Sequence, residues 1–376
     1  MSIIRELKDY ITINGIADKN ILFYAERSVY YKYFESLIES ILKSSEENII
    51  YVSSDINDNI FTLGNPRIRT FYINKLLKPF LQYLNCKIFV TTMTELGNHN
   101  FIRSKANKDI EYIYVFHAVV STNMMYNEGA FDNYDTIFTV GAHHNKEIRE
   151  REETAAGKQK RLVNFGYPLL DKLAEKYETT ESSPQPDTIL IAPSWHGGNI
   201  LDLCIDDVIA NIDIDKRRLI IRPHPEYLKR YEDRFKKLMK KYEKSGIIFD
   251  TDMLSNNSMY NADLLITDWS GIAYEYAFAA LRPVLFINTP KKEYNPDYIK
   301  CINQPMEVTL RDKCGESIDI DNLNNLNEVI NNFFDKYDSY KNRIKSLRDE
   351  YIYNFGLSEK GGAEYIINKL SDTRRK

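Results

Sequence analysis

The sequence lacks the features of a membrane-spanning or exported chain. No apolar stretch reaches the roughly 18 residues that a bilayer crossing requires. Four charged side chains, Arg5, Glu6, Lys8 and Asp9, interrupt the first 13 residues, which do not form the apolar core of a signal peptide. We therefore predict a cytoplasmic protein.

The N-terminal segment nevertheless has an apolar pattern of its own. Ile3, Ile4, Leu7 and Ile11 recur at helical spacing. Such a face either packs on the protein body or lies on a membrane surface. Packing is the favoured interpretation, and peripheral contact with the inner face of the membrane is the alternative.

Cysteine is scarce, and its spacing excludes two common structural devices. The four cysteines lie far apart and form no C-x-x-C pair, so neither a zinc site nor a disulfide framework is indicated. The pair His143-His144 lacks the E-x-x-H companion of a zinc helix. We predict a reducing compartment and no metal ion.

A basic excess is also missing. The 50 Lys and Arg residues face 54 Asp and Glu residues, a net charge of -4, which argues against a general nucleic-acid binder. With 43% hydrophobic and 28% charged residues, the composition is that of a globular protein. A length of 376 residues suits two domains of comparable size.

Short apolar runs alternate with polar or helical segments along the whole chain, which is typical of parallel sheets covered by helices on both faces. The Ser/Thr/Pro-rich stretch at 176–187 separates two sets of runs, and we place a domain boundary there, between 1–180 and 181–376. The final helical stretch, 322–370, is predicted to be interrupted at 355–357 and 361–362, and part of it to cross back to the first domain. The predicted strands are 20–24, 49–52, 71–73, 88–90, 112–116 and 136–140, then 188–192, 219–221, 247–249, 264–267 and 284–287.

The segment 263–289 is the most informative, because it reads as strand, turn, helix and strand. Its turn, Asp268-Trp269-Ser270-Gly271, leads into a helical run. Unpaired amides and the helix dipole at such a position favour a phosphate, and Gly271 lets an anion approach the backbone. The alternative is that Asp268 or Ser270 only caps the helix. Glu275, on that helix, is a candidate for hydrogen bonds from ribose hydroxyls.

Other unusual residues also follow predicted strands. His117 comes after 112–116 and is a candidate general base, with a hydrogen-bonded core histidine as the alternative. In Arg222-Pro223-His224-Pro225 two prolines restrict the backbone, which suits a fixed cationic pair for a phosphate or a rigid turn. The loop 192–198 offers polar contacts from Ser194 and His196, and Gly197 and its neighbour Gly198 permit close backbone approach.

These pieces together resemble one known family, the CDP-glycerol glycerophosphotransferases of teichoic-acid polymerase type. The resemblance covers about 110–360, and 23–104 is similar to the N-terminal half of short, stand-alone members. Members commonly carry a second serine where Gly271 stands and an aspartate where Glu275 stands. They also commonly show Trp-His-Gly where this chain has Phe116-His117-Ala118. The matching motifs are Phe116-His117, Gly166-Tyr167-Pro168-Leu169-Leu170-Asp171, Ile191-Ala192-Pro193-Ser194-Trp195, Arg222-Pro223-His224-Pro225, Thr267-Asp268-Trp269-Ser270-Gly271 and Arg282-Pro283-Val284-Leu285-Phe286.

The resemblance implies an α/β protein of GT-B fold, in which two Rossmann-like domains face one another across a cleft. It implies an N-terminal acceptor-side domain, 1–180, and a C-terminal domain, 181–376, that binds the nucleotide donor. The implied reaction transfers glycerol phosphate from CDP-glycerol to a hydroxyl of a cell-envelope glycan or lipid-linked precursor, with no required cofactor. His117, Arg222 and His224 would be catalytic. The donor would be bound by Ser194, His196, Gly197, Asp268, Ser270, Gly271 and Glu275.

Three alternatives remain open. A GT-B glycosyltransferase using a CMP- or UDP-activated sugar in capsule or surface polysaccharide synthesis shares turns similar to Arg222-Pro223-His224-Pro225. A nucleotide-binding scaffold module and a sugar-nucleotide epimerase are compatible with the same fold. The departures at Gly271 and Glu275 leave the transferred group open.

Overall fold

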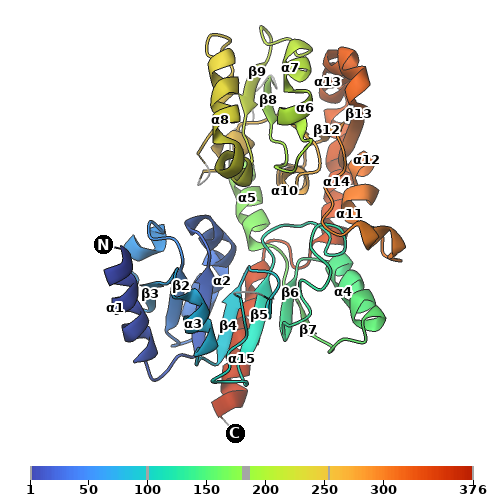
Figure 1. Ribbon diagram of the computed structural model, residues 1–376. Helices are drawn as coiled ribbons and strands as arrows, with labels where there is room; N and C mark the ends of the chain where they lie inside the picture. The colour runs from blue at the N-terminus through green and yellow to red at the C-terminus, as the bar shows by residue number, and fades with distance from the viewer. Residues whose placement is uncertain (1, 99–100, 180–186, 253–254, 375–376) are drawn as a thin grey trace. The chain divides into compact units, whose positions relative to one another are not determined.

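The computed structural model describes residues 2–98, 101–179, 187–252 and 255–374. These form two compact units, each a parallel sheet with helices on its faces (Figure 1). Unit 1 comprises 1–117, 127–169 and 351–376, and unit 2 comprises 118–126 and 170–350. The predicted boundary between residues 180 and 181 lies outside the described residues.

The sheet of unit 1 has seven parallel strands in the order β3-β2-β1-β4-β5-β6-β7. The central strands are buried along their whole length, because both faces are covered by helices. The strands are β1 (Ile21–Ala25), β2 (Ile49–Ser53), β3 (Ile68–Tyr72), β4 (Ile88–Thr91), β5 (Glu111–Val115), β6 (Thr136–Thr139) and β7 (Arg161–Asn164).

Helices from both ends of the chain complete unit 1. The apolar face of α2 and residues Ala363, Ile366 and Leu370 of α15 pack in one core with β1 and β2, and Figure 1 shows α15 running beside this sheet. The C-terminal segment is therefore a structural part of this unit. Its helices are α1 (Ser2–Asn14), α2 (Tyr31–Ser44), α3 (Leu77–Gln82), α4 (Ala142–Thr154) and α15 (Ser358–Arg374), with short 3₁₀ turns at Ser28–Tyr30 and Asn59–Thr62.

The sheet of unit 2 has six parallel strands in the order β10-β9-β8-β11-β12-β13. Because all pairs are parallel, the loops that follow β9, β8, β11 and β12 meet at the carboxyl edge of this sheet. The strands are β8 (Thr188–Ile191), β9 (Arg218–Ile221), β10 (Ile248–Phe249), β11 (Leu264–Thr267), β12 (Val284–Asn288) and β13 (Gly315–Asp319).

The helices of unit 2 cover both faces of this sheet. The longest, α8, begins directly after the Arg222-Pro223-His224 turn with Pro225 at its first position, where a missing amide is tolerated. The helices are α5 (Pro168–Thr179), α6 (Ile200–Leu203), α7 (Ile205–Ala210), α8 (Pro225–Lys241), α9 (Asn257–Tyr260), α10 (Ile272–Ala280), α11 (Met306–Thr309), α12 (Arg311–Cys314), α13 (Leu326–Asp335) and α14 (Tyr337–Tyr351), with 3₁₀ turns at Pro296–Lys300 and Ile320–Asn325.

The predicted α/β fold class is confirmed, but two strands escaped prediction. In β7 no residue is buried, and in β13 only Gly315 and Ile318 are, so neither has the continuous apolar run of a central strand. The predicted break at 355–357 is confirmed, because it lies between α14 and α15. The predicted break at 361–362 is wrong: both glycines lie inside α15, where a Cβ on Gly362 would come within 2.5 Å of the Phe165 ring.

The favoured packing role of the apolar N-terminal residues is also wrong. Helix α1 does pack on the body, but through the face that carries Glu6 and Ile13. Glu6 is buried and accepts hydrogen bonds from the amides of Asn74 and Leu76, both at 2.7 Å. The four apolar side chains named in the prediction lie on the opposite face, with 55% of Ile3, 75% of Ile4, 47% of Leu7 and 71% of Ile11 exposed.

Candidate active site

Asp268 holds together two of the loops at the carboxyl edge of the unit 2 sheet. Its fully buried carboxylate accepts hydrogen bonds from the amides of Ser194 (2.8 Å), Trp269 (2.6 Å) and Ile200 (3.2 Å). The three amide donors fix the orientation of this carboxylate. Asp268 thereby positions the loops after β8 and β11, and its predicted role in donor binding stays a prediction.

The first turn of α10 carries no side-chain cap. Its N-cap residue is Gly271, and neither Asp268 nor Ser270 caps the helix, so the capping alternative is wrong for both. Uncapped amides at a helix start are a favourable environment for a phosphate. Ser270 is buried at this turn, and Glu275 lies half-buried in the first helical turn, close to the predicted phosphate position.

Gly271 is required here for space and not for its backbone angle. Its φ of -62° is ordinary for any residue. A Cβ at this position would come within 2.9 Å of Cγ1 of Val120. Val120 belongs to the segment 118–126, which is part of unit 2 although it directly follows His117 in the chain.

The loop after β8 is fixed by a chain of hydrogen bonds through His196. Its Nε2 lies 2.8 Å from the carbonyl of Pro290, which can only accept, so Nε2 carries the proton. Nδ1 then accepts from the hydroxyl of Ser194, 2.5 Å away. Ser194 and His196 therefore join the loops after β8 and β12. Gly197 is exposed, whereas the neighbouring Gly198 has the positive φ, +86°, that favours glycine.

Arg222 is buried and engaged by its own unit. Its Nη1 donates to Asp250 at 3.0 Å and to Ser258 at 2.9 Å, which fixes the end of β9 against the residue that follows β10. A contribution to the pyrophosphate would come from a guanidinium that is already held in place.

His224 forms the start of α8. Its Nδ1 accepts from the amide of Glu226 at 3.1 Å, so a neutral ring carries its proton on Nε2. Its ring lies 6.4 Å from that of Trp195. The rigid-turn interpretation of this tetrapeptide fits the geometry, because the turn fixes the orientation of the imidazole; the predicted phosphate contact stays a prediction.

His117 follows β5 in unit 1, as expected for a residue at a strand's carboxyl end. Its ring contacts Tyr30 and Tyr33 edge-on, with centroids 5.7 and 6.0 Å away. Nδ1 lies 3.5 Å from the hydroxyl of Tyr114. The imidazole is half-buried among tyrosines, which orient it; its role as a general base stays a prediction.

The comparisons with known proteins identify the family. The family model described as CDP-Glycerol:Poly(glycerophosphate) glycerophosphotransferase matches residues 10–353. The chain belongs to this family. It is a CDP-glycerol glycerophosphotransferase-like transferase, as the motifs predicted. No curated protein matches the chain in sequence.

Solved structures show the same fold at low sequence identity. The wall teichoic acid polymerase TagF is 15% identical, with a TM-score of 0.64 over 99% of this chain and 95% of that one. A TagF variant soaked with CDPG is 14% identical, with a TM-score of 0.63 over 100% and 98%. A putative UDP-N-acetylglucosamine 2-epimerase from Listeria monocytogenes is 12% identical, with a TM-score of 0.57 over 95% and 97%. These likenesses establish the GT-B fold.

Sequence reasoning missed a lysine at the same sheet edge. Lys292 follows β12, and its Nζ lies 5.8 Å from the ring centre of Trp195 and 5.7 Å from that of Tyr294. Burial lowers the pKa of Lys292 to about 8, against the opposing influence of Asp268 and Glu307. The available signal was its position: Lys291-Lys292 follow a predicted strand, as do the residues that were recognised.

The segment 118–126 packs against the site turn, which also escaped prediction. Val120, Met124 and Met125 form a cluster with Trp269 and Tyr298. The amide of Ser121 donates to Oε1 of Glu307 at 2.8 Å, and burial raises the pKa of Glu307. No local motif predicts these contacts, because each joins residues that are far apart in the chain.

A second missed residue is Arg311, which supports the turn from the other side. It donates to the carbonyl of Asp268 at 2.8 Å and to Asn288 at 2.9 Å. Its guanidinium also lies 4.1 Å from the ring centre of Trp269, and burial lowers its pKa. Arg311 thereby fixes the turn from which α10 begins.

Two further observations concern metals and membranes. Within the described ranges, no three His, Cys, Asp or Glu side chains are grouped as they would be around a metal ion. The absence of a metal requirement stays a prediction. Of the helices that the structure describes, none combines the length and apolarity of a bilayer-spanning segment.

Proposed function

We propose that the protein transfers glycerol phosphate from CDP-glycerol to a hydroxyl of a cell-envelope glycan or its lipid-linked precursor, as in teichoic acid synthesis. The observation that carries the proposal is the carboxyl edge of the unit 2 sheet. There, the helix N-terminus at Ser270 and Gly271, which has no side-chain cap, is joined by Asp268 and His196 to the loops after β8 and β12. Lys292 lies on the loop after β12, and the ring of Trp195 in the loop after β8 lies 6.4 Å from that of His224. Family membership supports the choice of donor.

In the proposed reaction the acceptor oxygen attacks the phosphorus that bears glycerol. A new P–O bond forms, the P–O bond to the bridging oxygen breaks, and CMP leaves with the electron pair. His117 accepts the proton of the acceptor hydroxyl, a contribution of about 10²- to 10⁴-fold. His224, Arg222 and Lys292 stabilise the negative charge that develops on the leaving phosphate.

No resident metal is needed in this proposal, because cationic side chains and helix amides supply the positive charge. The α10 amides and Ser270 hold the donor phosphates, and Glu275 accepts hydrogen bonds from the ribose. Ser194, His196, Gly197 and Asp268 shape the loops around the donor.

A donor panel tests the proposal. Purified protein is incubated with CDP-glycerol, a CMP-sugar or a UDP-sugar and with an oligo(glycerol phosphate) acceptor, and released nucleotide is measured. Release of CMP from CDP-glycerol together with acceptor lengthening is expected. Turnover of a sugar nucleotide alone would instead establish the glycosyltransferase or epimerase alternative.

We also propose that α1 contacts the cytoplasmic surface of the membrane, where a lipid-linked acceptor would be found. The helix is held by the face that carries Glu6 and Ile13, while Ile3, Ile4, Leu7 and Ile11 face outward. Lys8 on the same helix is exposed. Four exposed apolar side chains beside a basic residue suit an interface helix on an anionic surface.

Vesicle co-sedimentation separates this contact from the catalytic proposal. The wild type should bind phosphatidylglycerol-containing vesicles, and the double variant Ile4→Asp/Ile11→Asp should lose most of that binding. The matched control is Leu357→Asp, which alters a side chain in the same unit that is 52% exposed. Equal vesicle binding by all three proteins would reject the role of α1 without affecting the transferase proposal.

A further inference from the structure

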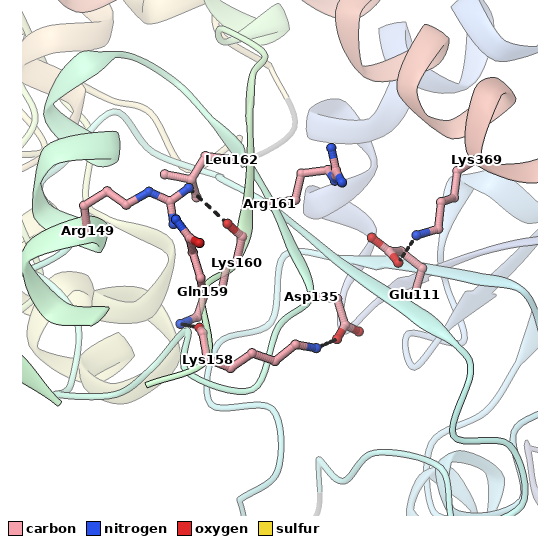
Figure 2. Close-up of a pocket in the computed structure, with 9 residues that line it drawn as sticks. All are labelled: Glu111, Asp135, Arg149, Lys158, Gln159, Lys160, Arg161, Leu162 and Lys369. Carbon is pink, nitrogen blue, oxygen red and sulfur yellow. Dashed lines mark hydrogen bonds and ion pairs between the residues drawn. The ribbon is translucent and has the colours of Figure 1, made fainter. Parts of the chain in front are cut away.

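A second feature of unit 1 lies at the opposite edge of its sheet, away from the strand end that carries His117. A pocket of about 520 Å³ opens at the amino ends of β5, β6 and β7 (Figure 2). Five cationic side chains and two carboxylates line it. They are Arg149, Lys158, Lys160, Arg161, Lys369, Glu111 and Asp135, with Gln159 and Leu162 completing the wall.

Both carboxylates are already satisfied by the protein. Glu111 accepts from Lys369 and from the hydroxyl of Tyr365, each at 2.7 Å. Burial acts to raise its pKa, but the hydrogen bonds outweigh burial and hold the pKa below its ordinary value. Asp135 forms ion pairs with Arg103 and Lys158, both at 2.9 Å. Burial acts to raise the pKa of Asp135, but hydrogen bonds hold it below its ordinary value. Neither carboxylate depends on a bound cation for its charge balance.

The wall of the pocket is built on a buried charged pair. Lys160 is 4% exposed, its amide donates to Glu152 at 2.8 Å, and its Nζ lies 3.7 Å from the same carboxylate oxygen. Arg149 donates to the carbonyl of Lys160 at 3.1 Å and pairs with Glu152. One carboxylate therefore balances two cations here, so positive charge remains in excess.

Arg161 adds a cation without a counter-charge. It is the first residue of β7 and is exposed. In the described part of the chain its guanidinium makes no hydrogen bond or ion pair, and Figure 2 draws no contact from it to another lining residue. A guanidinium presents paired N–H donors that match the oxygens of a phosphate.

We propose that this pocket is a second anion-binding site, for phosphate-bearing ligands. The cation excess and polar walls select an anion, and the volume exceeds that of a single inorganic phosphate. Two sources share this chemistry: the phosphodiesters of an anionic acceptor chain, or a free phosphate compound. The assignment of an acceptor chain as the ligand rests on the proposed function, whereas the binding of an anion does not. A chain held here would be anchored to unit 1 away from its reacting end.

The other unit provides a matched control. Unit 2 has a smaller pocket of about 290 Å³ at the amino edge of its own sheet. There, Arg218 is the first residue of β9 and is also exposed, but Asp187 and Asp215 offset much of the local positive charge. Arg161→Gln and Arg218→Gln thus remove the same charge at equivalent strand positions.

The first experiment measures binding of a fluorescent oligo(glycerol phosphate) by anisotropy at low salt, without donor. Arg161→Gln should weaken binding about fivefold, and Arg161→Gln/Lys158→Gln further, because each exposed charge contributes modestly. Arg218→Gln should bind as the wild type does. Equal affinity of the Arg161→Gln and Arg218→Gln variants would overturn the proposal.

Lysine acetylation read by mass spectrometry locates the site directly in the wild-type protein. Lys158 and Lys216 are comparable targets, because each pairs with an aspartate, at 2.9 and 2.8 Å, and is 73% and 79% exposed. The oligomer should protect Lys158 and leave Lys216 unprotected. Protection by inorganic phosphate at the same concentration identifies the free-phosphate source, and protection by the oligomer alone identifies the chain.

Failure of Lys158 protection with both ligands overturns the anion site. The donor panel is independent of this result, because it is read by nucleotide release. A protein that releases CMP normally without protecting Lys158 would retain the proposed function and lose only the second site.

Discussion

Lys292 gives the sharpest quantitative prediction, because its protonation changes near neutral pH. Burial lowers its pKa to about 8 in the free protein. The donor's pyrophosphate is an anion, so binding it favours the charged ammonium and raises the pKa in the complex. Above pH 8 the donor must therefore bind together with a proton.

The sign and size of the effect follow from linkage. Well below pH 8 the lysine is already charged and affinity is constant. Above pH 8 affinity falls by a factor of 1 + 10^(pH − 8), about tenfold between pH 7 and pH 9, until the pKa of the complex is reached. Lys292→Met should lower affinity at pH 7 by about 10- to 100-fold, the usual loss for a charged hydrogen bond, and should abolish the pH dependence.

Isothermal titration with CDP-glycerol between pH 6.5 and 9.5 measures this directly. Lys300→Met is the charge-matched control, because its amine pairs with Asp297 and is 74% exposed. The control should keep the wild-type pH profile. A wild-type affinity that does not change between pH 7 and pH 9, or a Lys292→Met profile that parallels it, would refute the role of Lys292.

Three other substitutions test separate parts of the account. His117→Ala should lower turnover at least about a hundredfold while leaving CDP-glycerol affinity unchanged, and wild-type turnover would exclude the general-base role. Gly271→Ala should cost about 1–3 kcal/mol in urea unfolding, because its Cβ would meet Val120 at 2.9 Å. Val120→Ala in the same chain should restore most of that loss, and absence of rescue would contradict the contact. Asp268→Asn should destabilise the protein by about 1.5–3 kcal/mol, because an amide cannot reproduce all of its charge-assisted hydrogen bonds; unchanged stability would contradict its positioning role.

Local pattern predicted most of the fold, for a physical reason. A central parallel strand is buried on both faces and therefore reads as a continuous apolar run, as 264–267 and 284–287 do. Strands β7 and β13 lack that burial and escaped recognition. Gly361-Gly362 misled the helix prediction, because glycine there provides space against Phe165 and does not end the helix.

The sequence likewise predicted some features of the candidate site and not others. The positions of Ser194, His224 and Ser270 after predicted strands correctly placed their loops at one edge of a sheet. Sequence could not reveal that Asp268 is wholly occupied by backbone amides, or that Arg311 supports the site turn. Such contacts join residues tens of positions apart, so no local pattern encodes them.

The orientation of α1 could not be predicted from the sequence, for a different reason. Its apolar periodicity is genuine, but buried acids can fix the opposite face of a helix when backbone amides satisfy them, as they do for Glu6. Periodicity identifies the apolar face and not the surface that covers it. The exposed face of Ile4 and Ile11 therefore required the structure.

Backbone hydrogen exchange with and without CDP-glycerol tests the central claim most directly, because it locates the donor without any substitution. Uncapped amides at a helix start exchange readily and become protected when an anion binds them. The account predicts donor-dependent protection at 270–272, with further protection at 195–198 and 291–292. Protection confined to unit 1, or no change at 270–272 under saturating donor, would contradict it.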